Sequence, residues 1–246
     1  MLKKLIKNSS LSYFAYELFL LITKPLIYSR YIYDYLNTKN EFKFQIKSIN
    51  KKNIKKSCLI VAFGTVYSTK LESVLASRLL KLGWKVNVLI QGHNPWIKRY
   101  FKILGLSTIN HINSFKIEKK ILNHIYRQEI KLDNDNLNFK TIKKIKYKDV
   151  VIGPTVLSSV MRYYRTAMIF LKPDFFKLFK LNLIEAMINV HRSEKILSHY
   201  KPDLIYLIEP NDLNKPLVDL SIKNNIKVIM INQNIRDDGL ILKLLN

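Results

Sequence analysis

The sequence contains little cysteine and glycine, and each shortage excludes a class of protein. A single cysteine, Cys58, among 246 residues excludes an internal disulfide framework and any site built from several cysteines, which suits a reducing compartment. Only 6 glycines are present, which leaves little room for a glycine-rich loop that cradles phosphates. The turn after the first buried run reads FGTVYST, which is neither a dinucleotide fingerprint nor a Walker A loop, and no G-x-S-x-G elbow occurs. The five histidines are spread along the chain without a metal-binding spacing, so we expect no metal site.

Acidic residues are also scarce: the sequence contains 18 of them and 42 basic residues, which gives a net charge of +24. Such an excess suggests nucleic acid, an anionic membrane or an anionic substrate as a partner. Codon bias in an AT-rich genome is the alternative, because most of the cations are lysines and the chain is rich in Asn and Ile. Residues 1–57 hold 12 basic and 3 acidic side chains, whereas residues 201–246 hold 6 of each. This uneven distribution is expected if one face meets an anionic surface.

Long hydrophobic runs are absent from the N-terminal segment, residues 1–50, which we predict to be an amphipathic helical arm. Its longest apolar piece, residues 18–23, is far shorter than the roughly 20 residues of a spanning helix, so no transmembrane segment is predicted. Glu17 interrupts the apolar run and no small-residue cleavage site follows, which argues against a signal peptide. Two interpretations remain open for the arm. It packs on the body of the protein, or it lies on an anionic membrane through its apolar face, its tyrosines and the flanking basic residues Lys3, Lys4, Lys7 and Arg30.

Apolar runs alternate with helical periodicity through the body, residues 56–234. This pattern predicts the α/β class: one Rossmann-like domain with a mostly parallel sheet, helices on both faces and the run CLIVAFG (58–64) at its centre. In the helix expected over residues 65–83, the apolar stripe consists of Val66, Leu71, Val74, Leu75, Leu79 and Leu82. We expect residues 235–246 to form a C-terminal tail. Further strands of the same sheet are expected over residues 85–92, 107–112, 149–154, 201–210 and 226–234.

Ligands of such sheets bind at the carboxyl ends of the strands, and polar residues stand at those positions. Glu209 and His93 each follow an apolar strand directly, where a partly buried titratable group can act as a general base, although a structural role is the alternative for both. The same strand ends supply candidate substrate-binding residues, for several of which a tight turn or a helix cap is the alternative. These candidates are Gly64, Thr65, Asn94, Asn211 and Gln233.

Two arginines, Arg162 and Arg165, lie one helical turn apart after the strand expected to end at Gly153. Arginine is rare among the basic residues here, and two guanidinium groups at a strand end can clamp a phosphate or pyrophosphate. Surface ion pairing is the alternative. If all these residues converge in one cleft, the arginines face an anionic acceptor group and Glu209 or His93 takes a proton from it.

The body resembles the N-terminal, acceptor-side domain of GT-B glycosyltransferases, in particular those of bacterial capsule and surface-polysaccharide biosynthesis. The resemblance rests on the stretches CLIVAFGTVYSTKLESVLASRLLKLGWKVNVLIQ (58–91), GPTVLSSVMRYYR (153–165) and HYKPDLIYLIEPNDLNKPLVDLSIKNNIKVIMINQN (199–234). It implies transfer of a sugar from a nucleotide-sugar donor to a glycan or lipid-linked acceptor, with no tightly bound cofactor. It also implies a second, donor-binding domain, for which this sequence leaves no room after residue 234, so we expect a separate chain to supply it or the acceptor half to be truncated or repurposed.

The resemblance further implies a cytoplasmic protein at the inner face of the cell membrane. Two hypotheses of other classes compete with the glycosyltransferase half. One is a non-catalytic, membrane-associated assembly factor that keeps the fold without the chemistry. The other is a basic nucleic-acid-binding module, which the neutral C-terminal stretch and the lack of a recognisable binding motif disfavour.

Overall fold

The computed structural model describes residues 10–42, 56–62, 64, 66–91, 95–106, 108–127, 138–165, 174–208, 214–233 and 240–245. The chain divides into two compact units whose segments alternate along the sequence. Unit 1 consists of Met1–Ser114, Pro202–Ile208 and Ile231–Ile241. Unit 2 consists of Phe115–Lys201, Glu209–Met230 and Leu242–Asn246.

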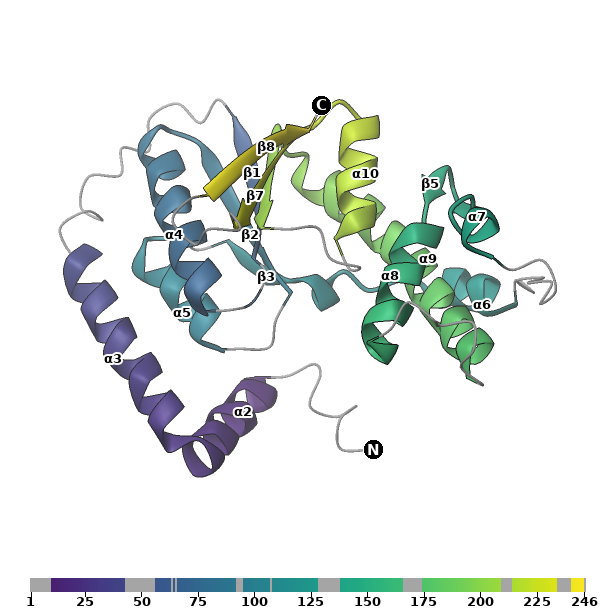
Figure 1. Cartoon of the computed structure of the whole chain (residues 1–246). Coiled ribbons are helices and arrows are strands. Elements are labelled where there is room, and N and C mark those ends of the chain that lie inside the picture. The colour runs from purple at the N-terminus through teal and green to yellow at the C-terminus, as the bar shows by residue number, and fades with distance from the viewer. Residues whose placement is uncertain are drawn as a thin grey trace. The chain divides into compact units, whose positions relative to one another are not determined.

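Six strands form one sheet: β1 (Ser57–Ala62), β2 (Lys85–Ile90), β3 (Ile109–His111), β6 (Leu204–Ile208), β7 (Lys227–Gln233) and β8 (Leu240–Leu245). Their order across the sheet is β3-β2-β1-β6-β7-β8 (Figure 1). β1 pairs in parallel with β2 and β6, and β2 pairs in parallel with β3. The predicted α/β class and mostly parallel sheet are therefore confirmed, and the architecture is consistent with a Rossmann-like domain.

Strand β1 lies inside this sheet, as its continuous apolar sequence predicts. Residues 58–62 are at most 1% exposed, and burial raises the pKa of the Cys58 thiol to about 12, so that the thiol stays protonated and unreactive. At the strand entrance, Ser57 donates its backbone N–H to Oδ2 of Asp203 at 2.7 Å. The backbone N–H of Asp203 in turn donates to the carbonyl oxygen of Ser57 at 2.9 Å. This reciprocal pair of hydrogen bonds fixes where β6 begins beside β1.

The C-terminal residues differ from the expected tail, because β8 adds a strand to the sheet beside β7. Residues 234–239 separate the two strands. A parallel crossover needs about a dozen residues or more, so neighbours joined by so short a connection run antiparallel. The sequence signal for β8 is weak, since LILKLL fits a helix as well as a strand until a neighbouring strand edge is available.

The strand expected over residues 149–154 is not part of the main sheet, and this prediction is wrong. β4 (Lys146–Tyr147) and β5 (Val150–Val151) pair antiparallel with each other in a separate two-stranded sheet. Lys148 and Asp149 form the turn between them with φ values of 46° and 64°. Positive φ at both central residues is what a tight hairpin turn requires. Because of this turn, Val150 and Val151 pair with Tyr147 and Lys146, and the segment forms a local hairpin.

Helix α4 (Val66–Lys81) buries a different face from the one predicted. Val74 and Leu82 of the expected apolar stripe are 39% and 74% exposed. The buried face is mostly small and polar, and it lets the helix lie close to β1 and β2, which it contacts. Its members are Ser68, Thr69, Glu72, Ser73, Ala76 and Ser77.

Within the expected N-terminal arm, the described residues 10–42 form two helices of unit 1, α2 (Ser10–Thr23) and α3 (Pro25–Phe42). Helix α3 packs on α5 (Pro95–Ile103) through three tyrosines spaced three and four residues apart, which places them on one helical face. The ring centroids of Tyr28, Tyr31 and Tyr35 lie 5.9, 6.3 and 5.5 Å from that of Trp96. One face of the arm therefore covers the body of its own unit.

Unit 2 is mainly helical and is organised around its longest helix, α9 (Phe175–Tyr200). The buried side chains of α9 follow each other at intervals of three or four residues, and the helix contacts α6, α8 and α10. The described residues of this unit also form α6 (Lys119–Arg127), α7 (Phe139–Ile142), α8 (Gly153–Tyr164) and α10 (Lys215–Lys223).

Gly153 is required by the close approach of α8 to the end of α7. A Cβ atom at this position would lie 1.7 Å from the carbonyl oxygen of Ile142, which is backbone and cannot swing aside. We expect Gly153→Ala to destabilise the protein by about 1–3 kcal/mol, the usual cost of overpacking. Urea unfolding measures the change, and Ser158→Ala, on the exposed side of the same helix, is the matched control. An unchanged midpoint for Gly153→Ala would contradict the packing described.

Candidate functional site

Most of the candidate residues predicted from the sequence lie outside the described part of the chain. The structure therefore leaves the predicted convergence in one cleft untested. The residues outside the described ranges are Thr65, His93, Asn94, Glu209 and Asn211. Gly64 follows β1 with a φ of 107°, a conformation that favours glycine, and Gln233 is the last residue of β7.

Arg162 and Arg165 lie at the end of α8 in unit 2. Arg162 is exposed and its Nη2 lies 3.3 Å from Oγ of Ser158. Arg165 caps the helix in a left-handed conformation, with φ 53°, and donates its backbone N–H to the carbonyl oxygen of Met161. The strand before this helix belongs to the β4–β5 hairpin, so the argument that placed both arginines at the edge of the main sheet is wrong.

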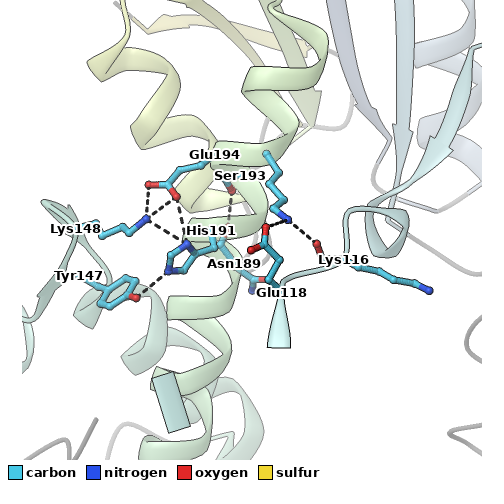
Figure 2. Close-up of polar contacts among 9 residues, drawn as sticks. Lys116, Glu118, Tyr147, Lys148, Asn189, His191, Ser193 and Glu194 are labelled. Carbon is cyan, nitrogen blue, oxygen red and sulfur yellow. Dashed lines mark hydrogen bonds and ion pairs between the residues drawn. The ribbon is translucent and has the colours of Figure 1, made fainter. Parts of the chain in front are cut away.

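A polar cluster that the sequence analysis did not single out surrounds His191 on α9. The imidazole is 8% exposed, and its Nε2 lies 2.9 Å from Oη of Tyr147 (Figure 2). Nζ of Lys148 lies 3.2 Å from Nδ1 of His191 and also donates to both carboxylate oxygens of Glu194, at 3.0 and 2.7 Å. The hairpin thus supplies Tyr147 and Lys148, and α9 supplies His191 and Glu194 one turn apart.

These contacts define the protonation state of His191. An ammonium group only donates hydrogen bonds, so Nδ1 accepts from Lys148 and the ring proton lies on Nε2. Burial, and after it the charge of Lys148, lowers the pKa of His191 below 6.5, and Glu194 opposes this shift. The 3.4 Å contact between Nδ1 and Glu194 is therefore not an ion pair at neutral pH, because the ring is uncharged and Lys148 already pairs with the carboxylate.

A second ion pair involves the next residue of α9, Lys195, and Glu118 (Figure 2). Nζ of Lys195 lies 3.1 Å from Oε1 of Glu118 and 3.1 Å from the carbonyl oxygen of Lys116. It joins the helix to the segment that precedes α6. Beside it, unit 2 is hollowed by a shallow pocket of about 520 Å³, lined by Phe115, Glu194, Lys195, Ser198 and His199.

The pocket offers hydrogen-bonding groups together with one aromatic side. Phe115 is half-buried, and its ring packs edge-on against His199 with the centroids 5.4 Å apart. No group of three or more potential metal ligands gathers within the described ranges. The arrangement suits recognition of a small polar molecule, with the carboxylate of Glu194 held in place by Lys148.

The sequence carries only part of the signal for this cluster. His191 and Glu194 stand three residues apart, which places them on one helical face, but a search for metal-binding histidine pairs does not detect that spacing. Tyr147 and Lys148 precede His191 by more than 40 residues and reach it only because their hairpin forms. Nothing local in the sequence predicts that approach.

The outer side of α2 and α3 is a second candidate surface, which we call the outer face of the arm. It is defined by large apolar side chains that remain exposed: Leu18 (47%), Phe19 (55%), Leu21 (49%), Ile22 (71%), Leu26 (84%), Ile27 (42%), Ile32 (37%), Tyr33 (67%) and Leu36 (50%). None of the helices among the described residues is long and apolar enough to cross a membrane.

The acidic and basic side chains of the arm lie in different environments. The carboxylate of Glu17 lies 2.7 Å from Arg99 of α5, and that of Asp34 lies 3.3 Å from Lys70 of α4. Both acidic groups are thus neutralised by the body of unit 1. Lys24, Arg30 and Lys39 are exposed, so the charged side chains that residues 17–40 present to solvent without an acidic partner nearby in this stretch are basic.

No protein-family model matches the chain, and a search of curated proteins found no significant match.

The protonation state of His191 is directly testable by NMR. We expect a ring proton on Nε2 and a titration midpoint below 6.5, because burial and Lys148 disfavour the cation. Lys148→Met should raise the midpoint and Glu194→Gln should lower it further. The free energy of unfolding should fall as the pH drops below 6.5, because the unfolded chain then binds a proton that the folded chain does not.

Lys195→Met is the matched control for Lys148→Met, since Lys195 makes the smallest contribution to the pKa of His191. It should shift the midpoint less than Lys148→Met. A midpoint at or above 6.5 in the unmodified protein would contradict the described environment.

Proposed function

We propose that this chain is the acceptor-binding half of a glycosyltransferase-like protein of surface-polysaccharide biosynthesis, working on the cytoplasmic surface of an anionic membrane. The observation that carries the proposal is the outer face of the arm. The glycosyl-transfer part rests on the Rossmann-like sheet and on the resemblance of residues 58–234 to acceptor-side domains.

The arm has the two sides that attachment to a membrane surface requires. Its inner side is fixed to α5 by Tyr28, Tyr31 and Tyr35, so the helices do not need the outer side for packing. Exposed apolar residues gathered on one side of a protein mark an interaction surface. Burying each such side chain in an apolar medium contributes about 1.5–3 kcal/mol, which makes the boundary region of a bilayer a favourable environment for this face.

Charge favours an anionic membrane over a neutral one. With Glu17 and Asp34 paired to the body, Lys24, Arg30 and Lys39 remain to meet lipid headgroups. Each cation near an anionic surface contributes about 1 kcal/mol, and salt screens this contribution. Attachment should therefore combine an apolar part that persists at high salt with an electrostatic part that does not.

A polysaccharide acceptor that grows on a lipid carrier is confined to the same surface. We propose that the chain binds this acceptor while a nucleotide-sugar donor is held by a separate chain. Transfer forms a glycosidic bond to an acceptor hydroxyl oxygen, releases the nucleoside diphosphate and requires a base for the hydroxyl proton. Glu209 and His93 remain the predicted bases.

Attachment is tested by sedimentation with vesicles of phosphatidylglycerol mixed with phosphatidylcholine. We expect the full chain to sediment with these vesicles and only weakly with phosphatidylcholine alone. Ile22→Ser combined with Leu26→Ser should lower the partition coefficient roughly 100-fold, because two buried aliphatic side chains contribute about 3 kcal/mol or more.

Leu82→Ser combined with Tyr163→Ser is the matched control, because these side chains are 74% and 70% exposed outside the arm. That variant should sediment like the unmodified protein. Unmodified protein that stays in the supernatant would contradict the proposal. A dimer in vesicle-free solution that the Ile22→Ser and Leu26→Ser changes dissociate would show that a second copy covers this face.

A further inference from the structure

We propose that the pocket at the C-terminal end of α9 binds a neutral sugar ring, and that it is the acceptor subsite of this chain. The inference rests on the proposed function and adds to it the place and the class of ligand. The residues that line the pocket in the described part of the chain all belong to unit 2, so these residues form the site within one compact unit.

The size and position of the pocket suit a small ligand. Its volume of about 520 Å³ lies within the usual range of roughly 300–1,000 Å³ for small-molecule sites. Four of its five lining residues come from the last turns of α9, and Phe115 comes from the segment before α6. A site built on a long, packed helix holds its groups more precisely than one built on loops.

The charges around the pocket cancel in pairs. Lys195 pairs with Glu118 at 3.1 Å, and Lys148 pairs with Glu194 at 2.7 Å. A phosphate or carboxylate ligand would meet both lysines together with both acidic partners, and those carboxylates would repel it. A neutral molecule rich in hydroxyl groups avoids this repulsion and can both donate to the carboxylates and accept from the ammonium groups.

The polar groups at the pocket match the hydrogen bonding of a sugar. Glu194 accepts hydrogen bonds from hydroxyl groups, and Lys148, which also donates to His191, holds its carboxylate in one orientation. Ser198 and His199 are exposed at the pocket, and each can donate or accept. Such a mixture serves hydroxyl groups, which also donate and accept.

Phe115 supplies the apolar side of the pocket. Its ring is held by edge-on and tilted contacts with His199 and Tyr200, with centroid distances of 5.4 and 5.7 Å. One face of a pyranose ring consists of C–H groups, and these pack well on the electron-rich face of an aromatic ring. The ring of Phe115 can therefore pack on the C–H face of a pyranose, and the carboxylate of Glu194 can bind its hydroxyl groups.

Binding is tested with the full chain by saturation-transfer NMR, using the methyl glycosides of glucose, galactose, mannose and N-acetylglucosamine as probes. We expect saturation of the ring C–H protons of at least one glycoside. Phe115→Ala and Glu194→Gln should each weaken the dissociation constant of that glycoside about tenfold, as loss of an anchoring contact typically does. The matched controls are Phe139→Ala, which removes a 40% exposed ring elsewhere in unit 2, and Glu185→Gln, which neutralises an exposed carboxylate two turns earlier in α9.

Unchanged binding by Phe115→Ala and Glu194→Gln would overturn the assignment of the pocket, as would the absence of saturation with all four glycosides. Inorganic phosphate that shifts the resonances of Ser198 and His199 while the glycosides do not would show an anion site and would also overturn it. The vesicle assay contains no sugar and this assay contains no vesicles, so failure of the sugar site and failure of membrane attachment are separate results.

Discussion

The parallel pairing of β1 with β2 and β6 is the constraint on which the rest of the structure depends. Parallel neighbours cannot be joined by a tight turn, so each must be reached through a long crossover. Asp203 meets Ser57 across 146 residues of sequence, and the carboxylate and both backbone groups that join them set the register of β6. Much of unit 2, including α9 and the β4–β5 hairpin, lies within that interval. The polar cluster around His191 is therefore carried by an excursion between two central strands of the sheet.

The sequence predicts the strands that are buried on both faces and misses elements decided by distant contacts. Residues 58–62 (CLIVA) and 204–208 (LIYLI) are continuous apolar segments, and both form interior strands. The face of α4 could not be predicted from hydrophobicity, because close approach to the sheet favours Ser68, Thr69 and Ser73 over the larger side chains of the apolar stripe. Val150 and Val151 look like a sheet strand until the two-residue turn before them is recognised, and neither turn residue is the Gly or Asn that usually marks one.

The same distinction applies to the candidate sites. The periodicity of the arm predicts its amphipathic character. One side packs on α5, as one of the two interpretations expects, and the other side remains exposed, while its attachment to a membrane stays a proposal. The cluster around His191 depends on Tyr147 and Lys148, which are distant in sequence, so a linear search for motifs finds only half of it. Site residues that are predicted because they follow a strand are correct only if that strand belongs to the main sheet. For Arg162 and Arg165 the preceding strand, β5, belongs to the separate hairpin instead.

Strand β8 bears on how the edges of the sheet are protected from pairing with another molecule. One edge of the sheet ends in β3, which has only three residues, and the other ends in β8, where the exposed Lys243 stands in the middle of the strand. Short strands and central lysines are the devices by which natural sheets resist pairing with a second molecule. The next strand inward, β7, reads KVIMINQ and carries a single charge at its first residue. Strand β8 therefore covers the apolar edge of β7, where a second molecule could otherwise extend the sheet.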